Sequence, residues 1–208
     1  MAVSASADRR RTGPRYDANP VNASFRQRLF DALEESIAED GYPKTTIADV
    51  VRRARTSRRT FYEHFTSKDD CFVALLAEAN AEQIRQITAA VDPAAPWDVQ
   101  ARQAIEAWIA SIESRPALML SWIRDVPALA STARRLQRDA MDNFITMVQA
   151  LTDSEGFRAA APVSRQRIIM LLGGLRELTA ITVEDGGRIS DISEEAVAAA
   201  IALVDPRH

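Results

Sequence analysis

The spacing of apolar residues along the chain is helical from about Ser24 onward. Apolar positions recur every three or four residues, which is the period of an amphipathic α-helix. The first stripe stops at Gly41 and Pro43, where a helix is expected to end. Its members are Phe25, Leu29, Leu33 and Ile37. No segment shows the alternation of a strand, and no internal repeat is present. The pattern therefore predicts an all-α fold.

A short helix is predicted after that stop. The run Thr46-Ile47-Ala48-Asp49 resembles a capping box, in which a hydroxyl and a carboxylate satisfy the free N–H groups of a helix start. The residues that this helix would bury are Ile47, Val50, Val51 and Ala54. Arg55-Thr56-Ser57 then forms a tight connection, because Ser57 is a good N-cap for the next helix.

The second short helix spans about 58–64 and keeps Phe61 and Phe65 on its inner side. Ser67 is a further N-cap and begins a long helix over about 68–90. Two short helices joined by a tight turn are typical of a helix-turn-helix, in which the outer side of the second helix faces a DNA major groove. The residues on that outer side are Arg58, Arg59, Thr60, Tyr62 and His64.

The rest of the chain is also predicted to be helical. Asp92-Pro93 and Pro96 interrupt the pattern. Proline at 116, 127 and 162 suits the first turn of a helix, where its missing N–H is not needed. Helices are expected over 97–113, 116–125, 127–151, 162–184 and 193–204. We therefore predict an N-terminal three-helix helix-turn-helix domain over 20–68 and a C-terminal helical ligand-binding and dimerisation domain over 69–208.

Residues 1–19 contain almost nothing that could be buried and are predicted to form a disordered basic arm. Two interpretations stay open: a terminus with no role, or an arm that reaches the DNA minor groove through its arginines. No apolar run follows these arginines, and no stretch of the chain approaches the length of a membrane span. We therefore expect a cytoplasmic protein without a membrane partner.

The charge of the chain is unevenly distributed. The net charge of the 208 residues is −3. Between residues 41 and 68, however, seven basic residues face only two acidic ones, whereas from residue 71 onward 13 basic residues face 18 acidic ones. Binding to a polyanion depends on the local patch, so the basic cluster indicates a nucleic-acid surface on an otherwise acidic body. The plainer alternative is a solvated charged face.

The segment from Thr45 to Asp70 resembles the DNA-binding domain of TetR-family transcriptional regulators. The resemblance rests on the Thr45-Thr46 pair, on the Ser-x-x-Thr-Phe-Tyr-x-x-Phe run from Ser57 to Phe65, and on Ser67-Lys68-Asp69-Asp70. About 50 residues are covered. The remaining residues match only in length and helicity, as the diverged ligand-binding domains of that family do.

The resemblance implies roles for individual residues. Thr46 and Lys68 would contact phosphates at helix N-termini, and Tyr62 would bind the DNA backbone. The base-reading residues would be Arg58, Arg59, Thr60 and His64, next to the N-cap Ser57. It also implies a homodimer on double-stranded DNA with a palindromic operator, which places two recognition helices in successive major grooves.

The C-terminal segment carries aromatic and methionine residues in a helical domain with few charges. Such residues usually form a core, but together they suit a cavity for a small hydrophobic effector. The candidate ligand-binding residues are Trp108, Met119, Trp122, Phe144 and Met147.

The last two helices are the candidate dimer surface. Gly173 and Gly174 would permit close helix approach, and the final helix over 193–204 is small and apolar. The apolar face of the preceding helix is expected to consist of Leu171, Leu172, Leu175 and Leu178. The alternative is that both helices only complete the core of the monomer.

No catalytic, cofactor or metal site is predicted. The sequence has one cysteine and two histidines, and it lacks a glycine-rich phosphate loop and usefully spaced carboxylate pairs. Cys71 begins an apolar run and is expected to be a small buried hydrophobe, rather than a redox switch or a nucleophile with His64 as its base.

We therefore predict a homodimeric repressor released by a small hydrophobic ligand. One alternative is a constitutive DNA-binding regulator or activator with no small-molecule ligand. Another is a helical binding or catalytic protein that has lost DNA binding, although the intact run from Arg58 to Tyr62 argues against it.

Overall fold

The computed structural model describes residues 20–129, 131–152 and 163–204, and within these ranges it contains helices and no strands. The all-α prediction is confirmed. The predicted arm over 1–19 lies outside the described residues. The elements are α1 (Pro20–Asp40), α2 (Ile47–Arg53), α3 (Arg58–His64), α4 (Lys68–Ala90), α5 (Trp97–Glu113), α6 (Pro116–Arg124), the 3-10 helix η1 (Val126–Ala128), α7 (Ser131–Thr152), α8 (Arg165–Glu184), the 3-10 helix η3 (Ile189–Ile192) and α9 (Ser193–Val204).

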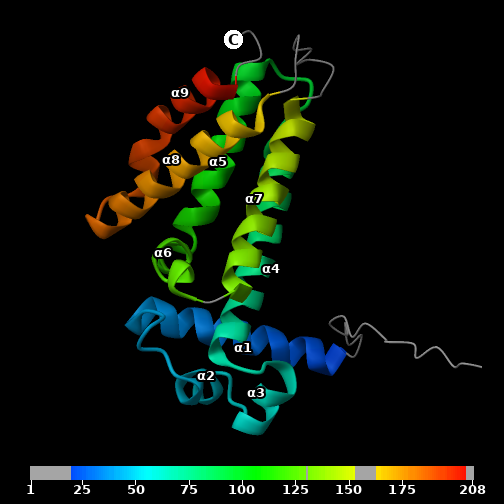
Figure 1. Cartoon of the computed structure of the whole chain (residues 1–208), viewed down its shortest axis with the longest axis vertical. Coiled ribbons are helices and arrows are strands. Elements are labelled where there is room, and N and C mark those ends of the chain that lie inside the picture. The colour runs from blue at the N-terminus through cyan, green and yellow to red at the C-terminus, as the bar shows by residue number, and fades with distance from the viewer. Residues whose placement is uncertain (1–19, 130, 153–162, 205–208) are drawn as a thin grey trace, which may run out of the picture.

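The helices form two connected groups (Figure 1). Helices α1, α2 and α3 lie at one end of the molecule, and α4 extends from them into the other group. There α4 packs against α5 and α7, while α8 packs against α6 and α9. Helix α6 also contacts α1, so the C-terminal group rests directly on the N-terminal one.

Local capping explains why the short helices begin where they do. Thr46 and Asp49 form the predicted capping box of α2. The Ser57 and Ser67 hydroxyls each accept a hydrogen bond from a backbone N–H three residues later, at the starts of α3 and α4. Gly41 ends α1 with a φ of 77°, a left-handed conformation that favours glycine. These boundaries of α2, α3 and α4 agree with those predicted.

Two predicted helix starts in the C-terminal half are wrong. Pro127 lies in η1 rather than in the first turn of α7, because Leu129 is extended, with φ −81° and ψ 135°, and separates the two helices. Helix α8 begins at Arg165 rather than at residue 162, because Ser164 is extended and its hydroxyl caps the backbone N–H of Arg167. Residue 162 itself lies outside the described residues.

The core consists of two clusters of buried side chains. The first surrounds Phe30, Phe61 and Phe72 and fills the space between α1, α3 and the start of α4. It continues past the predicted domain boundary at residue 68, because α6, η1 and α7 contribute to it through Leu118, Val126, Ala133 and Leu136. The N-terminal domain therefore shares its core with the C-terminal one.

The second cluster corrects the predicted dimer face. Leu171 and Leu175 are buried inside the monomer, and Leu172 is partly buried against the same cluster. One side of α9 is buried there too, through Ala196, Val197, Ala200 and Val204. The exposed apolar side chains of α8 are instead Ile169, Met170, Leu178 and Ile181. Of the predicted leucines, only Leu178 remains on the surface, because the others fill the space between α5, α8 and α9.

None of the helices described, over 20–129, 131–152 and 163–204, is long and apolar enough to cross a bilayer.

Candidate nucleic-acid interface and ligand cavity

Helix α3 presents one buried side and one exposed side. Phe61 is fully buried, and its ring lies 5.7 Å from that of Phe65, measured between centroids. The opposite side is exposed, with Tyr62 56% accessible to solvent. We call this exposed side the recognition surface; its members are Arg58, Arg59, Thr60, Tyr62 and His64. The structure thus brings the predicted α3 residues together on one short helix.

The hydroxyls of Ser57 and Thr60 meet at the N-terminus of α3. Ser57 Oγ accepts a hydrogen bond from the backbone N–H of Thr60 at 3.0 Å, and the two hydroxyl oxygens are also 3.0 Å apart. Ser57 is exposed and Thr60 is partly exposed. A hydroxyl has one donor and two acceptor sites, so the pair retains capacity to bind a phosphate or a base edge.

The two neighbouring arginines of the recognition surface differ in their partners. Arg59 Nε lies 3.1 Å from Glu63 Oε1 within the same helix. Arg58 is exposed and forms no ion pair with any residue of the described ranges. Because a carboxylate neutralises Arg59, Arg58 is the stronger candidate for bidentate contact with guanine or with phosphate.

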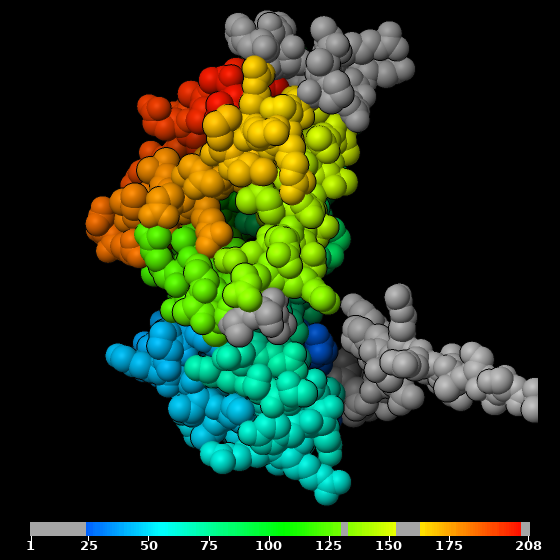
Figure 2. All heavy atoms as spheres, in the orientation of Figure 1, coloured from blue at the N-terminus to red at the C-terminus, as the bar shows by residue number. Residues whose placement is uncertain are grey.

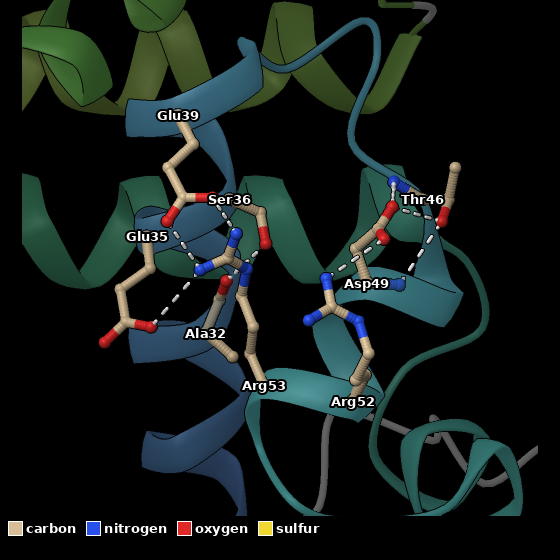
Figure 3. Close-up of polar contacts among 8 residues, drawn as sticks. All are labelled: Ala32, Glu35, Ser36, Glu39, Thr46, Asp49, Arg52 and Arg53. Carbon is tan, nitrogen blue, oxygen red and sulfur yellow. Dashed lines mark hydrogen bonds and ion pairs between the residues drawn. The ribbon is translucent and has the colours of Figure 1, made fainter.

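Thr46 lies at the N-terminus of α2, where its backbone N–H and its hydroxyl both donate to Asp49 Oδ2, at 3.1 and 2.5 Å (Figure 3). The hydrogen bond from the Thr46 side chain is the main cause that lowers the pKa of the Asp49 carboxyl. Arg52 adds a contact of 3.5 Å to the same carboxylate. The predicted phosphate contact of Thr46 would therefore have to form beside an ionised carboxylate.

Arg53 belongs to the basic cluster in sequence but not to the exposed surface. Its side chain is only 17% exposed and pairs with Glu39 and Glu35 of α1 (Figure 3). Arg53 Nη1 lies 2.9 Å from Glu39 Oε1. Glu35 and Glu39 lie outside residues 41–68, so the net charge of that segment overstates the positive charge available to DNA.

Lys68 has a structural role that the sequence did not indicate. Its Nζ donates to the backbone oxygens of Tyr42 and Thr45, each at 2.9 Å, and lies 4.1 Å from the centre of the Tyr42 ring. Burial lowers the pKa of the Lys68 ammonium. An ammonium has three donors, so one remains for the predicted phosphate contact. Tyr42 and Thr45 precede Lys68 by more than 20 residues, so these hydrogen bonds could not be predicted from adjacent residues.

The turn between α2 and α3 contains a second feature that the sequence did not indicate. Arg55 has a φ of 49°, in the left-handed region where side chains are disfavoured. The Arg55 N–H donates to Arg52 O at 3.3 Å and the Thr56 N–H to Val51 O at 3.0 Å, which is a Schellman motif. This motif sets the tight turn and leaves the Arg55 side chain exposed beside the recognition surface.

Cys71 is fully buried, as predicted. Burial raises the pKa of its thiol to about 12. Since the thiolate is the reactive form, this environment argues against a nucleophilic or redox-sensing role.

A cavity of about 160 Å³ lies between α4, α5, α6, α7 and α8. Figure 2 shows a hollow bordered by α7 in yellow-green and α8 in orange. Four of the five predicted ligand-binding residues line this cavity: Trp108, Met119, Trp122 and Phe144. The fifth, Met147, lines a second cavity of about 70 Å³. The two cavities share walls made by Trp108, Phe144 and Leu172.

The larger cavity is more polar than the sequence indicated. Three charged residues, Glu82, Arg115 and Arg176, line it. Arg115 binds Glu34 of α1 through two contacts of 2.7 and 2.5 Å, and Glu82 pairs with Arg85. The Gln83 amide also donates to the Ser111 hydroxyl at 2.6 Å. The Arg115–Glu34 pair matters most, because it joins the cavity wall to the N-terminal domain.

Comparisons with known proteins decide the family. The family model for bacterial regulatory proteins of the tetR family matches residues 29–75, which include α2, α3 and most of α1. Residues 29–75 therefore carry the DNA-binding domain of TetR-family transcriptional regulators. This assignment confirms the resemblance drawn from Thr45 to Asp70.

A second similarity covers only part of the chain. Over 69 residues the chain is 32% identical to the uncharacterized HTH-type transcriptional regulator YxbF of Bacillus subtilis (strain 168). The match covers 33% of this chain and only 18% of YxbF.

Solved structures extend the likeness in fold to most of the chain. The regulator FadR of Bacillus subtilis, solved in complex with stearoyl-CoA, superposes with a TM-score of 0.73 at 16% identity, over 86% of this chain and 98% of FadR. The fatty acid degradation regulator FadR of Bacillus halodurans gives a TM-score of 0.75 at 15% identity, over 92% of this chain and 97% of that one. At such identities the likeness is one of fold.

Proposed function

We propose that this TetR-family chain is a cytoplasmic, homodimeric repressor that binds a palindromic operator through α3 and is released when a small hydrophobic or amphipathic ligand enters the cavity. The observation that carries the proposal is the combination of an exposed recognition surface with a cavity linked to α1 by the Arg115–Glu34 pair.

DNA binding is supported by the exposed polar and basic side of α3. Arg58 can contact guanine or phosphate, and the Ser57–Thr60 hydroxyls lie at the helix N-terminus. Tyr62 is 56% exposed, so its hydroxyl is free to donate to a DNA phosphate. One such helix reads only a half-site. Two copies spaced one DNA turn apart, about 34–36 Å, would read a palindrome.

Dimerisation through α8 and α9 is supported by an apolar surface that the monomer leaves open. Met170 is 57% exposed and Ile181 is 46% exposed, although both are large and apolar. Between them, Gly173 and Gly174 have no heavy atom within 4 Å of where a Cβ would lie. A second copy packing on this surface would bury the exposed side chains in a closed twofold bundle.

Ligand-dependent release is supported by the position of the cavity. Arg115 occupies the N-cap position of α6, and α6 contacts α1. A ligand that changes the packing of α6 can therefore alter the Arg115–Glu34 contact and the orientation of α1. Release requires that the ligand bind the DNA-free conformer more tightly than the DNA-bound one.

The test has two steps. Genomic fragments retained by the purified protein are sequenced to obtain the operator. Apolar and amphipathic metabolites are then screened by quenching of tryptophan fluorescence, because Trp108 and Trp122 line the cavity. Each hit is titrated with and without operator, and reciprocity predicts weaker binding to the DNA-bound dimer by about 1–3 kcal/mol. Hits that bind equally in both states would contradict the switch and favour the constitutive regulator.

A further inference from the structure

Helix α8 presents three different sides. Ile168, Leu171 and Leu175 pack into the core, while Met170 and its exposed neighbours form the outer surface. The third side faces the larger cavity and consists of Leu172, Arg176 and Thr179. This spacing of four and then three residues places an arginine between two uncharged neighbours on the cavity wall.

Arg176 lacks the carboxylate partner that buried arginines usually have. It is partly buried, and its Nη2 donates to the backbone oxygen of Ile123 at 3.1 Å. The neighbouring acids Glu177 and Glu184 bind Arg124 instead, at 3.0 and 2.7 Å. Within the described ranges Arg176 forms no ion pair. A guanidinium has five N–H donors, so most of its capacity is unused.

The other two charges on the wall do not neutralise Arg176. Glu82 pairs with Arg85 and also accepts from Gln86, and Arg115 pairs with Glu34. Burial lowers the pKa of the Arg176 guanidinium, which reflects the desolvation of a positive charge in this site. An arginine in such a place binds a carboxylate or phosphate strongly, because its planar fork forms two parallel hydrogen bonds to either group.

The second cavity supplies the apolar half of a binding site. Its lining is almost entirely hydrocarbon, and it lies behind the shared walls of Trp108, Phe144 and Leu172. Arg176 is not among its lining residues, which include Met147, Leu175 and Val204. The larger cavity, with its one uncompensated cation, thus adjoins a smaller cavity that is apolar.

We propose that the effector is an amphipathic anion, with its acidic head on Arg176 and its hydrocarbon tail passing Trp108, Phe144 and Leu172 into the second cavity. This inference rests on the proposed function, since it specifies the ligand of the same cavity. The anionic head could be the carboxylate of a free fatty acid or the phosphates of an acyl-CoA thioester, and the experiment below separates these two sources.

The experiment compares three probes of equal chain length: decanoic acid, decanol and decanoyl-CoA. Each is titrated into the full-length protein and followed by tryptophan fluorescence. Wild-type protein is expected to bind at least one of the two anions about 10- to 100-fold more tightly than decanol, the range of a charge-assisted hydrogen bond. The anion that shows this preference identifies the source of the head group.

The variants are Arg176→Gln, Arg176→Met and Arg102→Gln. The two changes at 176 are expected to reduce anion binding to the level of decanol and to leave decanol binding unchanged. Methionine serves as the second variant because it fits an apolar wall without an unsatisfied polar group. Arg102→Gln is the matched control: it breaks the 2.7 Å ion pair with Glu194, which links α5 to α9, and Arg102 lines neither cavity, so this variant should preserve the preference for the anion.

Two results would contradict an anionic head group. One is equal affinity of the wild-type protein for acid, thioester and alcohol; the other is an equal loss of affinity for all three probes in Arg176→Gln and Arg176→Met. Either result would still be compatible with a hydrophobic ligand. Failure of all three probes to bind wild-type protein that still binds its operator would overturn both this inference and the ligand-release part of the proposed function.

Discussion

The recognition surface and the cavity both depend on arginine, but they are assembled in different ways. Residues 57–64 supply the recognition surface from one cap and one short helix. The cavity draws its walls from α4, α5, α6, α7 and α8. In each region one arginine is neutralised and another is not: Glu63 pairs with Arg59 but not Arg58, and Glu34 pairs with Arg115 but not Arg176. The presence of a carboxylate partner, rather than the residue type, separates an arginine that is paired within the protein from one that is free to bind a ligand.

The largest expected effect comes from separating the two copies. Gly174→Leu should fit the monomer, because no heavy atom lies within 4 Å of the new Cβ. On the proposed dimer surface it should clash, giving monomers by light scattering and about a 100-fold or greater loss of affinity for a palindrome, since bivalent binding is lost. Ala89→Leu adds similar bulk at an exposed position of α4 and should change neither measurement.

The next largest effect is expected on sequence discrimination, when the two neighbouring arginines of α3 are replaced in turn. Arg58→Ala should reduce discrimination between operator and scrambled DNA by about 1–3 kcal/mol, the value of a good base contact. Arg59→Ala should have a smaller effect, because Glu63 already neutralises that side chain. Competition binding measures both. An equal loss of discrimination in the two variants would show that the ion pair with Glu63 does not weaken the contact of Arg59 with DNA.

A third effect tests the link between the regions. Glu34→Gln keeps the shape of the side chain but removes the charge that holds Arg115. The coupling between ligand and operator should change by about 0.5–2 kcal/mol, while ligand affinity of the DNA-free protein changes little. Glu35→Gln is the control, because Glu35 faces Arg53, 3.9 Å away, instead of the cavity wall. Unchanged coupling in Glu34→Gln would remove this pair from the route of release.

The smallest effect concerns the turn between α2 and α3. Arg55→Gly should raise the free energy of unfolding by about 1 kcal/mol or less, since glycine relieves the left-handed strain but loses more backbone entropy on folding. Urea denaturation measures this change. Arg55→Ala retains the strain and is expected to give no gain. Equal stability of the alanine and glycine variants would show that the φ of 49° is not costly in this protein.

The sequence alone determined the local features of this protein. The side chains of Thr46, Ser57 and Ser67 each accept a hydrogen bond from a backbone N–H only three residues later. These caps, and therefore the starts of α2, α3 and α4, could be predicted from adjacent residues. The helical period also gave the all-α fold. Aromatic and methionine content indicated a cavity, and four of the five residues named for it line the larger one.

Only the tertiary structure decided how charges and apolar faces are paired. Lys68 reaches carbonyls more than 20 residues away, Arg53 meets acids of α1, and Leu171 and Leu175 enter the monomer core instead of a dimer face. Arg176 became a candidate because its neighbouring carboxylates bind Arg124. Each of these outcomes depends on which distant segment packs against the residue. The period of the sequence shows which face of a helix is apolar or charged. Which residues that face contacts is decided by how whole helices pack against one another.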